Sequence, residues 1–325
     1  MFERILVPLD GSIRAEIILD QILRLARRGD VEVVLLRVVD PLVPAYGGYD
    51  FQALLAAERL DAQQYLETQA KRLTKQGMTK VHVQIADGTP AEQILEAVRN
   101  SGATLLALAT HGRRGLARWA MGSVAERVVR ACEVPVFLTR SFRPGPRAPF
   151  WEPAPAEDQP VRKILVPTDG SEAARAAIGP AEKLALLFGA EVVVLHVVTP
   201  APMPGALLPG MEVPWTPMSP PALPASDKDE ATRATAERFA HAGLKTTRLT
   251  VMGDPAAEIV DHPALDGIDL IAMATHGRTG ASRWLLGSVT ERVLRHAKVP
   301  LLLVRANPEE TKPAREKAER QAAAQ

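Results

Sequence analysis

Two glycine-containing segments have the residue types and the spacing of an anion-binding site. Segments 109–126 and 274–291 share the order Ala-Thr-His-Gly, nine residues, then Gly-Ser. Each follows a short apolar run that predicts a buried strand and precedes an amphipathic run that predicts a helix. The unpaired N–H groups and the dipole of a helix N-terminus attract phosphate, and glycine lets the phosphate approach the main chain. The sequence therefore predicts two copies of one phosphate site.

The serine that closes each segment has a structural interpretation beside the functional one. Ser123 with Glu126, and Ser288 with Glu291, fit the capping box, in which the serine only starts a helix. A serine that caps one N–H still leaves other donors in the first turn, and its hydroxyl can turn to a phosphate oxygen. The repetition of the motif supports both interpretations and does not decide between them.

One aspartate follows the predicted first strand of each half. Asp10 and Asp169 lie at the strand end where open α/β sheets bind ligands. Such a carboxylate could accept hydrogen bonds from ribose hydroxyls or hold a metal-bound water, and the alternative is a cap for the next helix. His111 and His276 have no nucleophile or carboxylate partner nearby in sequence, so an orienting hydrogen bond is favoured over catalysis.

Several motifs of known chemistry are absent from the sequence. It has no G-x-x-x-x-G-K-[ST] loop, no G-x-G-x-x-G after the first strand and no H-E-x-x-H. These absences disfavour a P-loop motor and a dinucleotide dehydrogenase. The two segments also differ, because Thr279 stands where the first copy has Arg114. We therefore expect two sites of unequal charge.

Alternating strands and helices must position these residues. Strands are expected to begin at Ile5 and to cover 31–39, 79–85, 104–108 and 134–139, with helices between them. Ser12 is expected to cap the first helix, and the segment Thr89–Glu92 has the form of a capping box with proline at the first helical position. The order β-α-β-α-β-α-β-α-β predicts a parallel sheet with right-handed crossovers.

The whole pattern then recurs. Pro167 lies 159 positions after Pro8, whereas Gly277 lies 165 positions after Gly112, so the second copy gains six residues, expected in a proline-rich loop at 199–227. We expect two domains and two connecting or terminal segments. The domains are residues 1–142 and 161–306, the linker that resists regular structure is 143–160, and the charged tail is 307–325.

Composition limits the classes of partner and compartment. The chain of 325 residues has 39 basic and 38 acidic residues, so no large net field would attract nucleic acid or anionic lipid. Its one cysteine, Cys132, is expected on an apolar helix face, which favours an inert buried thiol over a redox role. The apolar runs are too short for a membrane span or a signal peptide, so the expected compartment is the cytoplasm.

These motifs resemble the universal stress proteins in their tandem two-domain form, over about residues 1–140 and 161–306. The ATP-binding pattern of that family is G-x2-G-x9-G-[ST]. The chain matches its last three positions in both copies and has alanine at the first glycine, and the residues concerned are Ala109, Gly112, Gly122, Ser123, Ala274, Gly277, Gly287 and Ser288.

The resemblance implies a fold and a set of site residues. The fold is two Rossmann-like domains of the adenine nucleotide alpha hydrolase type, each with five parallel strands in the order 3-2-1-4-5 and helices on both faces. The adenine and ribose side would be lined by Pro8, Asp10, Val38, Pro167, Asp169 and Val197. The phosphates would be held by Gly112, Gly122, Ser123, Val124, Gly277, Gly287, Ser288 and Val289.

The resemblance also implies a function and an assembly. We expect a stress-response and signalling module that binds ATP, with or without Mg²⁺, and acts on unknown protein clients without being an enzyme. The alternatives are an interaction scaffold that binds no nucleotide and a very slow ATPase. Family dimers commonly pair across the last strand, here 134–139 and 301–304, so one chain would be a pseudo-dimer, with a further homodimer as an alternative.

Overall fold

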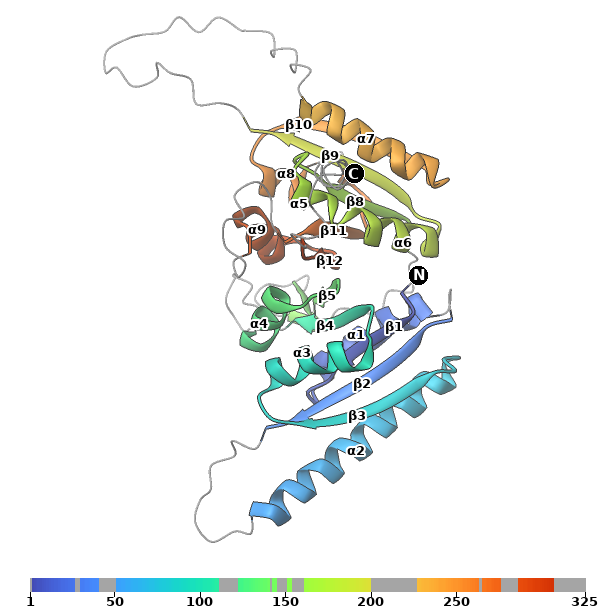
Figure 1. The fold of residues 1–325 in the computed structure, drawn as a ribbon, viewed down its shortest axis with the longest axis vertical. Helices are drawn as coiled ribbons and strands as arrows, with labels where there is room; N and C mark the ends of the chain where they lie inside the picture. Colours follow the sequence, from blue (N-terminus) through green and yellow to red (C-terminus); the bar gives the residue numbers. More distant parts are fainter. Residues whose placement is uncertain are drawn as a thin grey trace, which may run out of the picture.

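The computed structural model describes residues 2–26, 30–40, 51–110, 122–140, 142–144, 151–153, 161–199, 227–262, 265–275 and 286–306. Within this described part, ten strands form a single sheet in the order β10-β9-β8-β11-β12-β5-β4-β1-β2-β3 (Figure 1). The first half of the chain supplies one side of the sheet and the second half the other. Each half has the expected order 3-2-1-4-5, and its strands run parallel.

The described residues of the first half form five strands and four helices in the main sheet and its covering layers. The strands are β1 (Arg4–Pro8), β2 (Glu32–Val39), β3 (Val81–Asp87), β4 (Leu105–Thr110) and β5 (Val136–Arg140). The helices are α1 (Ile13–Ala26), α2 (Phe51–Lys75), α3 (Pro90–Ser101) and α4 (Ser123–Ala131).

The second half repeats this arrangement with its first helix divided in two. Its strands are β8 (Lys163–Pro167), β9 (Glu191–Val198), β10 (Thr246–Met252), β11 (Leu270–Ala274) and β12 (Leu301–Val304). Its helices are α5 (Glu172–Arg175), α6 (Ile178–Phe188), α7 (Asp227–His241), α8 (Pro255–Asp261) and α9 (Ser288–His296).

The sheet is covered on both faces, which explains why its strands are almost continuously apolar. One buried cluster joins the sheet to α1, α2, α6 and α7, and the other joins it to α3, α4, α8 and α9. Successive residues of a strand belong to opposite clusters, so that Ile5 and Val7 pack in the first and Leu6 packs in the second. Both cores continue across the junction between the halves.

Helix starts agree in part with the expectations. Ser12 caps α1, because its Oγ accepts a hydrogen bond from Ala15 N at 3.2 Å. Thr89 is the N-cap of α3, but its side chain makes no capping bond, so the capping box expected at 89–92 is not formed. Pro90 already fixes the entry into the helix, which does not depend on that bond. The strands expected at 79 and 134 begin at Val81 and Val136.

The segment between the halves is not wholly irregular, contrary to the expectation for 143–160. Strands β6 (Phe142–Pro144) and β7 (Trp151–Pro153) form an antiparallel pair. Both prolines lie in the outer pairs of this short ladder, where a missing N–H is tolerated, and the central pair joins Arg143 to Glu152.

The six extra residues of the second half fall between its second and third strands, as expected. Residues 40–80 separate β2 from β3, and residues 199–245 separate β9 from β10. The helix in this interval has 25 residues in the first half and 15 in the second. The proline-rich loop at 199–227 lies almost entirely outside the described residues, and the tail at 307–325 lies wholly outside them.

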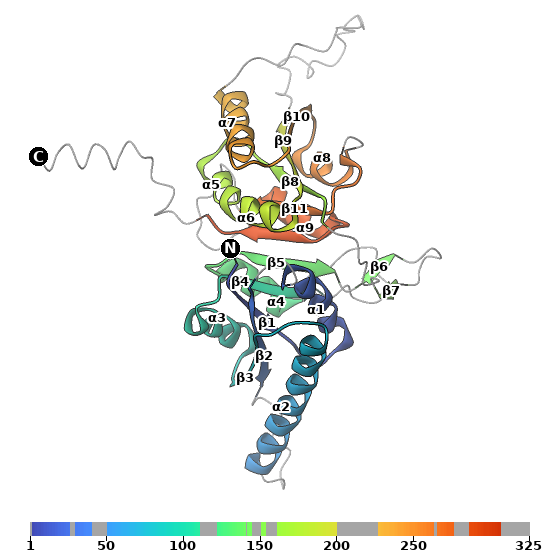
Figure 2. The same ribbon diagram turned by 90° about the vertical axis from the view of Figure 1, so that its right-hand side faces the viewer.

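The halves join through their last strands, β5 and β12, which pair antiparallel (Figure 1, Figure 2). Leu301, Leu302 and Leu303 lie opposite Leu138, Phe137 and Val136, and all six side chains are buried. Because β5 and β12 run in opposite directions, the strands of the two halves point in opposite directions. The carboxyl ends of the first set therefore lie on the same side of the sheet as the amino ends of the second set.

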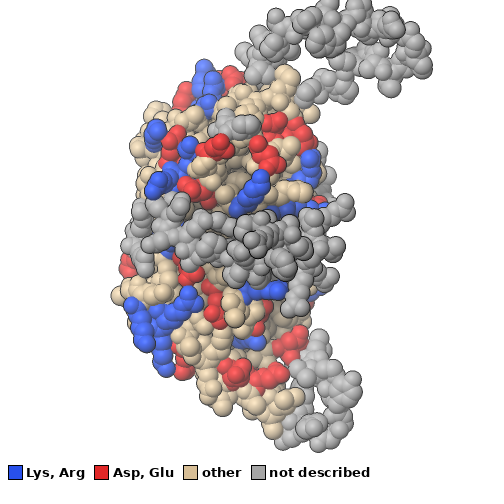
Figure 3. Space-filling view, turned by 180° about the vertical axis from the view of Figure 1, so that it is seen from behind, with Lys and Arg blue, Asp and Glu red and all other residues tan. Residues whose placement is uncertain are grey.

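The described surface carries both signs of charge. Figure 3 shows basic and acidic side chains on both halves of the face that it displays, which fits the formal net charge of +1. Among the helices that the structure describes, none combines the length and the apolar character that a bilayer crossing requires.

Candidate functional site

Each half has a topological switch point at the carboxyl end of its first strand. Strand β1 pairs with β2 on one side and with β4 on the other, and β8 lies in the same way between β9 and β11. The crossovers leave such a strand in opposite directions, and open α/β sheets bind ligands in the crevice that this creates. Pro8 and Pro167, two of the expected site residues, end β1 and β8 at these points.

The turn after β1 holds Asp10 in a fixed position. Oδ1 of Asp10 accepts hydrogen bonds from Ser12 N at 2.9 Å and from Ser12 Oγ at 2.6 Å. Gly11 has a φ of +81°, the left-handed region that favours glycine. The cap of α1 is therefore Ser12, and Asp10 supports the capping residue instead of capping the helix itself.

The turn after β8 repeats this geometry. Asp169 Oδ1 accepts from Ser171 N at 2.9 Å, Gly170 has a φ of +74°, and Ser171 Oγ accepts from Ala174 N at 3.2 Å. The two aspartates thus hold equivalent places at the two switch points, as their spacing in the sequence predicted.

The second strand contributes a polar side chain beside each turn, which the sequence analysis did not identify. Nη1 of Arg37 lies 3.4 Å from Leu9 O, and Nδ1 of His196 lies 2.9 Å from Thr168 O. An internal alignment of the two repeats would have shown this difference, because positions 37 and 196 are also 159 apart. The next residues, Val38 and Val197, are half-buried and pack against the core on the other face of the sheet.

The helices that follow the fourth strands begin one residue earlier than a capping box requires. Gly122 and Gly287 are the N-caps, with φ and ψ of −60° and 150° and of −61° and 146°. Ser123 and Ser288 are the first residues of α4 and α9, and neither helix has a side-chain cap. The capping-box interpretation of 123–126 and 288–291 is therefore wrong.

This start exposes the groups that a phosphate would need. Gly122, Ser123 and Val124 are exposed, and a Cβ added at Gly122 would meet no atom within 4 Å. Ser288 is exposed, and Gly287 and Val289 are partly exposed. Among the described residues no side chain caps α4 or α9, although the N–H of Gly287 donates to Thr275 O at 2.9 Å. The other N–H groups of each first turn are the kind of donor that binds a phosphate. The residues present therefore fit the phosphates of a nucleotide.

The alanines at the first position of the motif are ordinary strand residues. Ala109 lies within β4 and Ala274 ends β11, and no described residue other than glycine has a positive φ. Alanine therefore replaces glycine there without backbone strain. Gly112 and Gly277, together with the neighbouring histidines, Arg114 and Thr279, lie outside the described residues.

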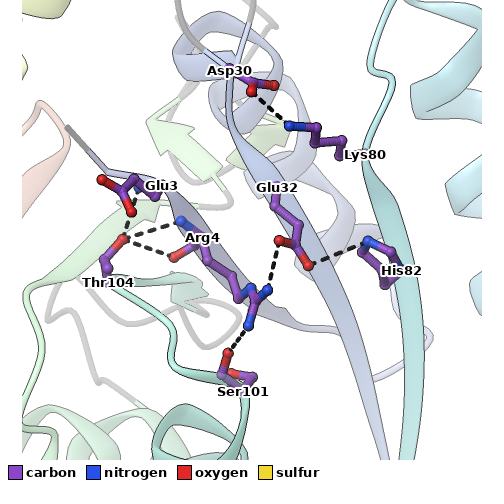
Figure 4. A network of polar contacts seen from close by, with 8 residues as sticks. All are labelled: Glu3, Arg4, Asp30, Glu32, Lys80, His82, Ser101 and Thr104. Carbon is purple, nitrogen blue, oxygen red and sulfur yellow. Dashed lines mark hydrogen bonds and ion pairs between the residues drawn. The ribbon is translucent and has the colours of Figure 1, made fainter.

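The opposite edge of the first half carries a polar network (Figure 4). Glu32 accepts from Arg4 Nη2 at 2.8 Å and lies 3.3 Å from His82 Nε2, and Lys80 Nζ lies 2.6 Å from Asp30. These groups lie at the amino ends of the strands, away from the crevice. Within the described ranges there is no group of three His, Cys, Asp or Glu side chains that could hold a metal ion.

Known proteins share both the sequence pattern and the fold. The sequence model of the universal stress protein family matches residues 1–140 and 160–305. A universal stress protein of Methanocaldococcus jannaschii is 38% identical over 144 residues, which cover 44% of this chain and 82% of the relative. One of Mycobacterium tuberculosis is 24% identical over 315 residues, which cover 93% of this chain and 96% of the relative.

A solved structure extends this similarity to the whole molecule. The crystal structure of a universal stress protein from Archaeoglobus fulgidus is similar with a TM-score of 0.70 at 20% sequence identity. The similarity covers 94% of this chain and 100% of that chain. At this level of identity the similarity supports the fold and not the ligand.

Proposed function

The chain belongs to the universal stress protein family, and from this premise we propose that it binds an adenine nucleotide, ATP, at two sites, one in each half. We also propose that residues 1–142 and 161–306 are the two nucleotide-binding domains and that 143–160 links them. The protein would act as a stress-response and signalling module in the cytoplasm, with ATP occupancy as its signal. Its partners would be protein clients.

The observation that carries this proposal is the arrangement at the two switch points. In both halves an aspartate follows the first strand, and a helix start without a side-chain cap follows the fourth strand, which is paired with the first. A carboxylate suits ribose hydroxyls, and an uncapped helix N-terminus suits phosphate. The two features lie on the two strands between which an α/β sheet binds its ligand.

In the proposed complex, side chains contact the adenine and the ribose, and backbone N–H groups bind the phosphates. Val38 and Val197 would pack against adenine, and Asp10 and Asp169 would accept from ribose, beside Pro8 and Pro167. Ser123 and Val124 in α4, and Ser288 and Val289 in α9, would donate N–H groups to the phosphates, as would the loop residues Gly112 and Gly277. Gly122 and Gly287 would let the phosphates approach the main chain, since the N–H of Gly287 already donates to Thr275 O at 2.9 Å. Mg²⁺ would enter with the phosphate oxygens.

Calorimetric titration with ATP and Mg²⁺ tests this proposal. Ser123→Asp and Ser288→Asp each put a carboxylate at the first helical position, where it stabilises the helix but repels phosphate. Each variant should lose one site, and the double variant should lose both. Ser123→Asn and Ser288→Asn are the matched controls, since they have the same size without the charge and should retain binding.

The alternatives give different results. An unsubstituted protein that releases no heat with ATP, ADP or AMP would overturn nucleotide binding and favour the interaction scaffold. Binding that is unaffected by both aspartate substitutions would place the nucleotide elsewhere. Release of phosphate from ATP that is lost in the double variant would favour the slow ATPase.

A further inference from the structure

The two halves differ at one side chain that touches the same backbone atom in both. Arg37 on β2 and His196 on β9 occupy equivalent positions. Each reaches the carbonyl oxygen of the residue before the site aspartate, Leu9 in the first half and Thr168 in the second. The two halves thus have a side-chain contact to the equivalent carbonyl oxygen, made by a guanidinium in the first half and by an imidazole in the second.

In the first half this group is a guanidinium on the ribose side of the proposed site. A Cβ added to Gly11 would lie 3.2 Å from Arg37 Nη1, so the guanidinium packs over the turn that holds Asp10. Arg37 is only partly buried. Since arginine stays protonated, it places a permanent positive charge at the edge of the crevice.

The charges of Arg37 and Asp10 both act on the pKa of a neighbouring tyrosine, Tyr65. Tyr65 on α2 donates to Glu16 Oε1 at 3.1 Å, and the pKa of Tyr65 is raised first by burial and then by Glu16 and Asp10, while Arg37 lowers it. Arg72 lies 3.7 Å from Glu16 and 3.0 Å from Asp20. The carboxylates of α1 therefore have a cation of their own in Arg72.

In the second half the equivalent group is an imidazole enclosed by the protein. His196 is 3% exposed, and its Nδ1 lies 2.9 Å from Thr168 O. An Nδ1–H at this distance donates to the carbonyl oxygen, and the contact orients the ring. The second turn therefore has no guanidinium at this place.

We propose that Arg37 makes the first site select adenine nucleotides that carry an additional phosphate on the 2′- or 3′-hydroxyl of the ribose. The second site, with His196, takes nucleotides whose 2′- and 3′-hydroxyls are free. A carboxylate beside the ribose accepts from its hydroxyls, and a nearby arginine accommodates a ribose phosphate through paired charge-assisted hydrogen bonds. The inference rests on the proposed nucleotide binding and adds the class of nucleotide that each site prefers.

The test compares adenosine 5′-monophosphate with the 2′,5′- and 3′,5′-bisphosphates of adenosine by calorimetry. Full-length Ser288→Asp reports the first site alone, and full-length Ser123→Asp reports the second. The first site should bind one of the bisphosphates about tenfold or more tightly than the monophosphate, the gain expected from hydrogen bonds to a charged group. The second site should show no such preference.

Arg37→His on the Ser288→Asp background should abolish the preference, and Arg37→Lys should retain part of it, because lysine keeps the charge without the bidentate geometry. The ratio of two affinities is the readout, so a general loss of binding does not imitate the effect. A ratio that is the same before and after Arg37→His, with monophosphate still bound, would overturn this inference and leave the proposed function standing. If none of these three nucleotides binds while ATP still binds, this inference is also overturned, whereas no binding of ATP, ADP or AMP to the unsubstituted protein would overturn the proposed function itself.

Discussion

Asp254 shows how one exposed side chain contributes to the stability of the fold through a helix cap and an ion pair. It is the N-cap of α8, where Oδ1 accepts from Ala257 N at 3.0 Å and Oδ2 lies 2.7 Å from Arg292 Nη1. Arg292 is the main cause that lowers the pKa of Asp254, and the cap bond lowers it further. The equivalent residue of the first half is Thr89, whose side chain makes no capping bond.

We expect Asp254→Asn to lower the free energy of unfolding at pH 7 by at most about 1 kcal/mol, because asparagine retains the cap and an exposed ion pair contributes little. The folded pKa lies below the unfolded one, so the carboxylate stabilises the protein above the unfolded pKa of about 3.9 and loses this effect as the pH falls through the folded pKa. Denaturant titrations at neutral and acidic pH measure the difference. A difference that stays constant below pH 4 would contradict the prediction.

Cys132 is buried, as its apolar surroundings in the sequence predicted, but it is the extended C-cap residue that follows α4 and does not lie on the face of a helix. It is 1% exposed, and burial raises its pKa to about 11. Hydrophobic spacing predicts the burial of a small apolar side chain well and the end of a helix less well. Arg37 and His196 are different, since a single polar residue in an apolar strand gives no sign of the carbonyl that it contacts.

At the scale of elements, strand order and helix positions were predictable, and helix starts were predictable only in part, since Ser12 caps α1 as expected but neither Gly-Ser pair begins its helix as expected. Both Gly-Ser pairs offer two good N-caps, and local pattern alone favoured the serine. The choice of Gly287 is tied to a contact outside the helix, because its N–H donates to Thr275 O at 2.9 Å. The β6–β7 pair was missed for a similar reason, since its ladder joins residues that lie on either side of the proline-containing sequence 145–150.

Thr290 gives an element-scale prediction. Its hydroxyl donates to Ala274 O at 3.1 Å in a buried position and ties the first turn of α9 to the end of β11, whereas the first half has Ala125 there. We expect Thr290→Val to destabilise the protein by about 1–3 kcal/mol, because the carbonyl loses a buried donor while the shape is kept.

The matched control is Thr290→Ser, which keeps the hydroxyl. Thermal unfolding gives the stability, and hydrogen exchange of α9 should quicken in the valine variant while that of α4 does not change. Equal effects of valine and serine would show that the methyl group, and not the hydrogen bond, is the important part of Thr290.

At the scale of the whole molecule, the resemblance predicted the strand order within each half. No local sequence pattern predicted the side-chain contacts across the junction between the halves. Arg140 Nη2 donates to Arg295 O at 2.8 Å, and Arg305 Nη1 donates to Ala131 O at 3.2 Å. Arg140 ends β5 and Arg305 follows β12, and each reaches the C-terminal end of a helix in the other half, α9 or α4, where the helix dipole favours a cation. Burial lowers the pKa of Arg140 to about 10.

These reciprocal contacts and the antiparallel β5–β12 ladder give the junction an approximate two-fold symmetry, so the first half alone should pair with a copy of itself. In residues 1–140 produced without the rest of the chain, Val136, Phe137 and Leu138, each 3% exposed in the full chain, would form an open apolar edge. We expect analytical ultracentrifugation to show a dimer or a larger aggregate. Phe137→Lys in the fragment should weaken the association, and Ile13→Lys, at a position 78% exposed and outside the junction, should not. A fragment that is folded by circular dichroism and remains monomeric at high concentration would refute pairing through β5.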